Sequence, residues 1–476
     1  MRWLVLSAVV FVMMLSAQPV LSAEESGSSL FLEAKPVWAE GRDAEMNLVL
    51  GFRGVFEIPD SGAKAALNIA CSMYYRAWVN GEFLGHGPAR AGHGWFRVDE
   101  WDISDLLRPG RNIVAIEVNS PAVNGFGVLD QPGFLQAEVV SDGRVLAATG
   151  KEKTGFSARQ IVERVQRVQR YSFQRGFMEA YRMQPGADQW RTSADAPLEP
   201  EVRLKEVAPR HLLRRNIPLP AMNKAYAGRL VCAGKAEPYE PEHYWKDHTL
   251  ARGVSEQWKG YGPQELEEAY STTAQRYRYV KNADPARACG EKEVLPLEEN
   301  GYVILDFGRN LTGFLGLNVV CEKPVRLYAF FDEDQSGNDV KWTRLGCNNL
   351  IVWDLAPGTY ALESMEPNGM RYVKLLAAGA PCEVSGVFLR RYENGGLGRA
   401  RFEASDPRLN ELFDAAVATF AQNAVDIFMD CPHRERAGWL CDSFFTARTA
   451  FYLCGDSAVE RNFLENFALP ESFAYL

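Results

Sequence analysis

The turn-rich segment Glu393-Asn394-Gly395-Gly396 separates two parts of this chain that differ in the spacing of their apolar residues. Before it, short apolar runs lie between clusters of turn-forming residues, a pattern typical of β-strands. After it, apolar residues recur every three or four positions, as on one face of an α-helix. We therefore expect β domains up to about residue 395 and helices from about residue 400.

The segment 73–85, with Asn80-Gly81 at its centre, predicts a β-hairpin with a type I′ turn. This hairpin and the strands that follow it resemble a jelly-roll module. We expect a jelly-roll-like β-sandwich over residues 30–195 and a second β-sandwich, with an insertion, over residues 200–395.

Two segments between residues 150 and 300 have helical patterns. Gln160–Arg170 is basic, and we expect a solvent-facing helix there rather than a docking site. Pro263–Tyr279 is either a short helix or an insertion.

Three helices are expected after residue 400, and each has a start or stop signal. The first begins at Ser405 or Asp406 and runs to about Val425. The second runs from Asp442 to Cys454 and ends before a glycine. The third helix opens with a capping box formed by Ser457 and Glu460. The first helix has one apolar stripe, which consists of Leu409, Leu412, Phe413, Ala416 and Phe420.

The tract from Asp430 to Asp442 lies between the first two expected helices and contains three carboxylates, two arginines and a tryptophan. Glycoside hydrolysis requires a carboxylic acid that protonates the leaving oxygen, and further carboxylates bind hydroxyl groups or stabilise positive charge. The alternative is a set of solvated ion pairs that contribute little. Apolar neighbours favour the protonated form of a carboxyl group and arginines favour the ionised form, so both interpretations remain open.

Four segments occur in an order that resembles bacterial alpha-L-rhamnosidases, which are six-hairpin glycosidases of glycoside hydrolase family 78. Leu305–Phe314 resembles the Asp-Phe-Gly-x-Asn-x-x-Gly signature of their β-sandwich, and Phe402–Asp442 contains their Asp-Cys-Pro, Arg-Glu-Arg and Gly-Trp elements. Leu213–Pro218 resembles a linker, and Glu366–Val373 a strand that closes the sandwich. The resemblance extends from the first β-sandwich to the C-terminus.

The resemblance implies a role for each group in the acidic tract. Glu435 matches the general acid of the family. The carboxylates that hold sugar hydroxyls are matched by Asp430 and Asp442, and the pocket wall by Arg434 and Trp439. The chain departs from the common pattern in having Arg-Glu-Arg where Asp-Glu-Arg is frequent, and Cys441 where Gly is frequent, which bears on substrate preference.

The resemblance also implies an (α/α) barrel of six helical hairpins, whose later half supplies the carboxylate that activates water. Residues 400–476 provide the first helices of such a barrel. We therefore expect an inverting exo-glycosidase that releases terminal alpha-L-rhamnose, here truncated and without its general base. The alternative is a non-catalytic carbohydrate-binding or unstable fragment.

Jelly-roll modules bind sugar in some glycosidases and brace the catalytic domain in others, and we predict the bracing role here. Four residues would stack on a sugar in the first case and pack in the core or at an edge in the second: His86, His93, Trp95 and Trp101.

The formal net charge of −9 and the lack of a basic tract argue against nucleic-acid binding. Residues 1–23 resemble a signal peptide, so we expect a periplasmic or extracellular protein. No later apolar run is long enough to predict a membrane span. No cofactor is predicted, and the oligomeric state stays open.

The nine cysteines have spacings that fit neither a zinc site nor a disulfide framework. Cys431 and Cys441 flank the acidic tract closely enough for a bridge, but we favour buried free thiols. His433 has no partner histidine at a metal-binding spacing, so we expect it to line the pocket or pack against its rim.

Overall fold

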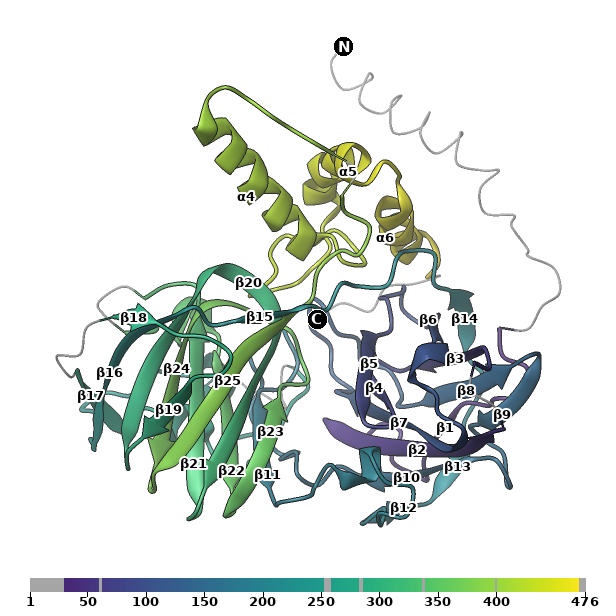
Figure 1. Ribbon diagram of the computed structural model, residues 1–476, viewed down its shortest axis with the longest axis horizontal. Helices are drawn as coiled ribbons and strands as arrows, with labels where there is room; N and C mark the ends of the chain where they lie inside the picture. Colours follow the sequence, from purple (N-terminus) through teal and green to yellow (C-terminus); the bar gives the residue numbers. More distant parts are fainter. Residues whose placement is uncertain are drawn as a thin grey trace.

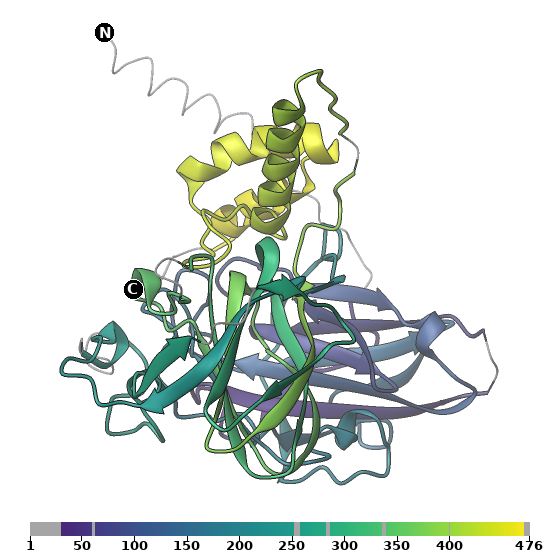
Figure 2. The same ribbon diagram turned by 60° about the vertical axis from the view of Figure 1, so that its left-hand side comes forward.

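The computed structural model describes residues 30–59, 62–251, 258–281, 286–335, 339–398 and 400–470. The expected signal peptide lies outside these ranges. Two β regions lie beside one another, and three long helices cover one end of both (Figures 1 and 2). The predicted order of β domains followed by helices is confirmed. None of the helices in the described ranges combines the length and apolar character that crossing a membrane requires.

The N-terminal β region consists of two sheets around one apolar core. The first sheet has seven strands: β1 (Val37–Ala39), β3 (Ala65–Cys71), β6 (Trp95–Asp102), β8 (Leu135–Ser141), β9 (Arg144–Ala148), β13 (Leu204–Glu206) and β14 (His211–Arg214). The second has six: β2 (Leu48–Ile58), β4 (Tyr74–Val79), β5 (Glu82–Gly87), β7 (Gly110–Ser120), β10 (Phe156–Gln160) and β12 (Glu201–Val202). Alternate side chains of both sheets, such as Leu50, Ile69 and Ile116, are completely buried between them.

The predicted hairpin is confirmed, because β4 and β5 pair through Asn80 and Gly81. These two residues have φ angles of 51° and 86°, as a type I′ turn requires.

The third sheet forms the second β region and has twelve strands: β11 (Glu179–Met183), β15 (Lys224–Tyr226), β16 (Arg229–Pro238), β17 (Tyr277–Lys281), β18 (Arg287–Ala288), β19 (Val294–Leu297), β20 (Gly301–Cys321), β21 (Val325–Asp332), β22 (Leu350–Leu355), β23 (Gly358–Glu363), β24 (Asn368–Ala378) and β25 (Cys382–Arg391). The boundary expected near residues 195–200 does not coincide with a change of sheet. β11 comes before it and pairs with β22, whereas β12, β13 and β14 come after it and extend the two N-terminal sheets.

The glycosidase-like signature lies at an irregularity in β20, where its pairing with β24 shifts between Asp306 and Leu311. Gly308 has a φ of 82° there, a conformation that favours glycine. Arg371 on β24 holds Asp306 through two hydrogen bonds of 2.9 and 3.0 Å. Two of the motifs that are distant in the sequence therefore meet in one ion pair.

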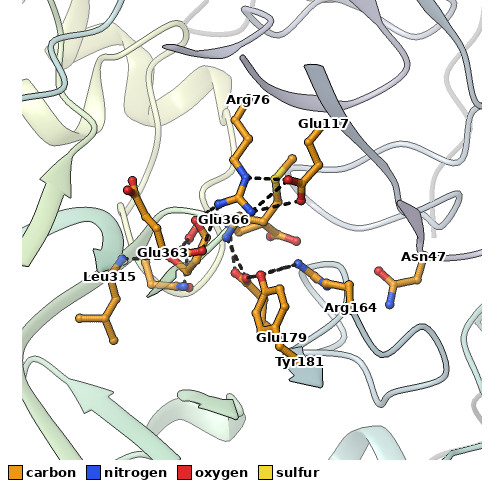
Figure 3. A network of polar contacts seen from close by, with 12 residues as sticks. Asn47, Arg76, Glu117, Arg164, Glu179, Tyr181, Leu315, Glu363 and Glu366 are labelled. Carbon is orange, nitrogen blue, oxygen red and sulfur yellow. Dashed lines mark hydrogen bonds and ion pairs between the residues drawn. The ribbon is translucent and has the colours of Figure 1, made fainter. Parts of the chain in front are cut away.

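Buried charges join the two β regions (Figure 3). Arg76 on β4 pairs with Glu117 on β7 at 3.1 Å and also donates a 3.0 Å hydrogen bond to the carbonyl of Glu363, at the end of β23. Glu179 on β11 pairs with Arg164 at 3.3 Å. These groups are nearly inaccessible to water, so each charge depends on its ion-pair partner, and the hydrogen bond from Arg76 to the Glu363 carbonyl crosses between the two β regions.

The prediction of a solvent-facing helix at Gln160–Arg170 is wrong. Gln160 ends β10, and Arg164 and Arg170 form isolated β-bridges with Tyr181 and Phe177. Both arginines are buried, and the Arg170 guanidinium donates hydrogen bonds to three backbone carbonyls. Within Pro263–Tyr279 the structure contains a short helix, α3 (Tyr270–Thr273), followed by the start of β17; one further short helix is α2 (His248–Ala251).

The three predicted C-terminal helices are present as α4 (Pro407–Asn423), α5 (Leu440–Cys454) and α6 (Ala458–Ala468). Asp406 caps α4 by accepting a hydrogen bond from the Arg408 amide, and Gly455 ends α5 with a φ of 74°. The capping box at Ser457 does not form, since its side chain makes no capping hydrogen bond. Only Phe420 of the stripe on α4 is fully buried, whereas Leu412 is 66% exposed.

Candidate functional site

The acidic tract forms a compact loop between α4 and α5. The Asp430 amide donates to the carbonyl of Ala437 at 3.0 Å, and the Ala437 amide donates to the Asp430 carboxylate at 3.1 Å. These two hydrogen bonds close the loop around residues 431–436. One carboxylate oxygen of Asp430 is therefore used to fix the backbone.

Glu435 is buried at the centre of this loop, with 8% of the residue exposed. One carboxylate oxygen accepts a hydrogen bond from the indole N–H of Trp439 at 3.2 Å, and the other contacts the guanidinium of Arg434. Trp439 is 41% exposed, so one part of its ring remains open to a ligand. The structure thus brings three of the five predicted site residues into direct contact.

The other two predicted residues contact different partners. Asp430 is held by Ala437, as described, and Asp442 lies exposed in the first turn of α5. A carboxylate at this position interacts favourably with the positive end of the helix dipole. The Cys441 thiol donates to Asp442 at 3.5 Å.

Arg436, next to Glu435, adopts a left-handed backbone conformation with a φ of 56°, which is uncommon for a residue with a side chain. Its carbonyl accepts a 2.7 Å hydrogen bond from Arg90, and its guanidinium donates to the carbonyl of Pro432. Burial lowers the pKa of Arg436 to about 10, and the charges of Arg175 and Arg90 act in the same direction. The conformation is therefore imposed by packing around the loop.

The residue two positions before Glu435 is held in a similar way. Arg175, which is buried, donates a 3.1 Å hydrogen bond to the carbonyl of His433 and another of 3.0 Å to the Asn368 side chain. Arg90 and Arg175 thus fix the main chain on both sides of Arg434 and Glu435. In the sequence, both arginines come before β11, the first strand of the third sheet.

A second carboxylate, that of Glu366, lies close to the loop. Glu366 and Glu435 line the same small cavity of about 20 Å³. Burial raises the pKa of Glu366, although the neighbouring Arg175 acts in the opposite direction. One of its carboxylate oxygens has no hydrogen-bond partner.

The histidines, cysteines and tryptophans singled out in the sequence occupy different environments. His433 is 3% exposed and packs between the rings of Tyr171 and Phe331. Cys431 and Cys441 are free thiols, and Cys441 is exposed rather than buried. His86 and Trp101 are buried in packing contacts, whereas His93 and Trp95 line a cavity of about 690 Å³ beside Trp439.

Three charged residues that shape the loop carry little signal in the sequence: Arg90, Arg175 and Asp426. The single cue is that Asp426 interrupts the apolar run Ala424–Met429. A buried charge in such a run requires a partner, but the sequence does not identify which one.

Comparison with known proteins agrees with the motifs. Residues 398–470 match the family model of the bacterial alpha-L-rhamnosidase 6 hairpin glycosidase domain. An alpha-L-rhamnosidase of Formosa agariphila is 28% identical over an alignment of 163 residues, and the match covers 32% of this chain and 17% of that protein.

Solved structures show a similar fold. The GH78 family rhamnosidase of Bacillus sp. GL1 superimposes with a TM-score of 0.74 and 19% identity, over 92% of this chain and 63% of that one. The alpha-L-rhamnosidase of Aspergillus terreus gives a TM-score of 0.60 and 18% identity, over 91% of this chain and 44% of that one. The chain therefore spans less than two thirds of the length of each of these relatives, and the predicted resemblance to bacterial alpha-L-rhamnosidases is confirmed.

Proposed function

We propose that the protein that carries this chain is an inverting exo-glycosidase that releases terminal alpha-L-rhamnose, with Glu435 as its proton donor. The main support is the environment of Glu435: its carboxylate is buried, bonded to a half-exposed tryptophan, and lies inside the segment that matches the glycosidase domain. A surface ion pair would leave both partners in solvent, which is not the arrangement of this carboxylate.

In this mechanism Glu435 protonates the glycosidic oxygen while positive charge develops on the sugar ring. Trp439 supplies an open aromatic face for the sugar, and we assign Arg434, Asp430 and Asp442 to binding of its hydroxyl groups. Asp430 has one oxygen fixed by the loop, and Asp442 is exposed and can reach a ligand from the start of α5.

An inverting enzyme also needs a base about 6.5–9.5 Å from the acid, with room for a water molecule between them. We place this base in the part of the relatives' length that the chain does not cover. The apolar residues exposed on α4 and α5 support this assignment, because further helices of a six-hairpin barrel would cover them: Leu412, Phe444, Phe445, Phe451 and Tyr452.

We further propose that residues 1–23 direct export, which would place the enzyme where extracellular or periplasmic glycans are available.

The test is hydrolysis of 4-nitrophenyl alpha-L-rhamnoside by the complete gene product. Glu435→Gln is expected to lower kcat by about 10²- to 10⁴-fold, the contribution of a general acid. Glu411→Gln, an exposed site on α4, serves as the matched control. Unchanged turnover in Glu435→Gln would refute the acid assignment, and NMR of the first-formed rhamnose anomer tests inversion.

The isolated 476-residue chain provides a second test. Hydrolysis by this chain alone would refute the proposal that the base lies elsewhere. Binding of rhamnose without hydrolysis by the complete gene product would favour a non-catalytic carbohydrate-binding protein.

A further inference from the structure

A cavity of about 690 Å³ lies between the N-terminal β region and the helical region. Residues of the segments 88–97 and 124–131 form one wall, and the other comes from the acidic tract and α6. The volume is within the range of small-molecule sites, which is about 300–1,000 Å³. The two segments of the N-terminal β region are loops or strand ends. The fold therefore places them next to the acidic tract, although they are far from it in the sequence.

The cavity lies next to residues that contact Glu435 or its neighbour Arg436. Trp439 lines it and donates its indole N–H to the Glu435 carboxylate. Phe126, on the opposite wall, meets the Trp439 ring edge to face at 5.4 Å. At Gly127 a Cβ atom would lie 3.2 Å from the Arg436 carbonyl, so the 124–131 segment packs directly on the loop that carries the acid.

The lining is mainly apolar. Trp95, Phe126, Leu129 and Phe463 contribute apolar side chains. Polar side chains form a smaller part of the lining and come from Arg90, His93, Arg97, Asn124, Gln131 and Asn466. A flat apolar group would bury its surface favourably against the apolar part of this lining.

We propose that this cavity binds the leaving group of the glycoside and selects an aromatic or other planar apolar group. The inference rests on the proposed function of Glu435. A proton donor acts on the oxygen between the sugar and the leaving group, so the leaving group lies on the donor's side of the bond. Trp439, which bonds the proton donor, and the N-terminal β region both line the cavity, so the inference makes that region part of the active site.

The experiment compares 4-nitrophenyl and methyl alpha-L-rhamnoside as substrates of the complete gene product. Phe126→Ala is expected to lower the aryl-to-methyl ratio of kcat/KM about tenfold, mainly through KM, because one aromatic contact with the leaving group is lost. Phe173→Ala is the matched control: Phe173 is 50% exposed and touches Phe126 at 5.9 Å, but it does not line the cavity. Leu129→Ala replaces Phe126→Ala if thermal unfolding shows that the latter does not fold.

A second readout does not depend on hydrolysis. Calorimetric binding of free 4-nitrophenol is expected to be weakened by Phe126→Ala and unaffected by Phe173→Ala. An unchanged ratio together with unchanged 4-nitrophenol binding would overturn the inference, as would a continuation of the chain that fills the cavity in the complete protein. Failure of the parent to cleave either rhamnoside, with 4-nitrophenol still bound through Phe126, would instead refute the proposed function.

Discussion

Arg90 donates a 2.7 Å hydrogen bond to the backbone carbonyl of Arg436, the residue that follows Glu435. The same guanidinium forms a buried ion pair with Asp426 at 2.5 Å. Although burial raises the pKa of Asp426, the charge and hydrogen bonds of Arg90 lower it to about 2. A loop of the N-terminal β region therefore fixes the main chain of the acidic tract, as expected of a module that braces the helical region.

Arg90→Met is expected to destabilise the protein by about 3–5 kcal/mol, because it leaves the Asp426 carboxylate buried without a partner. The measurement is urea unfolding of the purified chain. Adding Asp426→Asn removes the orphaned charge, so the double variant should recover part of the loss, as a double-mutant cycle would show.

The matched comparison is an exposed ion pair of the same region. Arg214 and Glu100 lie 3.1 Å apart with their side chains 55% and 59% exposed. Arg214→Met is expected to cost less than about 1 kcal/mol. Equal losses in the two arginine variants would contradict the bracing role of Arg90.

Trp439→Phe keeps an aromatic ring beside Phe126 but removes the N–H that bonds Glu435. A hydrogen bond to a charged group contributes about 1.5–3 kcal/mol, so we expect kcat for rhamnoside hydrolysis by the complete gene product to fall roughly 10- to 100-fold. The unfolding free energy should change little, since the side chain is 41% exposed. Trp245→Phe, whose ring contacts Trp342 in another part of the molecule, provides the control. If both variants retain parental turnover, the hydrogen bond has no part in catalysis.

Local signals predicted the elements well where they act over only a few residues. Asn80-Gly81, Asp406 and Gly455 occupy the turn, the N-cap and the C-cap for which their conformational preferences suit them. Gln160–Arg170 shows the opposite case. Its helical spacing arises from arginines that are buried by partners elsewhere in the chain, such as the Glu179 carboxylate that pairs with Arg164.

The candidate site divides in the same way. Arg434, Glu435 and Trp439 are near one another in the sequence, and their contacts follow from the short loop. Arg90 and Arg175 reach the loop across 346 and 258 positions of the sequence, so no spacing rule identifies them. The apolar stripe of α4 indicates which residues face a partner, but the stripe alone does not indicate whether that partner is present.

The two cysteines of the acidic tract should differ in reactivity. Cys441 is exposed, whereas Cys431 is half-buried and burial raises its pKa, which lowers its thiolate fraction. A thiol reagent applied to the native chain is expected to modify Cys441 before Cys431, and Cys441→Ser should remove this fast reaction. Mass spectrometry of non-reduced peptides gives the check, and a peptide pair bridged through these residues would show the prediction to be wrong.

The buried side chain of His433 is expected to make the unfolding free energy of the chain depend on pH. Burial, with contributions from Arg175 and Arg344, lowers its pKa from 6.5 to about 3. The ring packs between two aromatic side chains, an environment that favours the neutral imidazole in the folded state.

Because the folded pKa of His433 lies below the unfolded value, the unfolded chain binds this proton first. The unfolding free energy should therefore fall as the pH decreases from about 6.5 towards 3, by up to about 1.4 kcal/mol per pH unit. His433→Gln lacks this titration, so its loss of stability between pH 7 and pH 5 should be smaller by about 2 kcal/mol than that of the parent. His243→Gln, at an exposed position, should keep the parental pH dependence. Urea unfolding at both pH values distinguishes these outcomes, and identical pH dependence in the two variants would mean that His433 is not the buried neutral group.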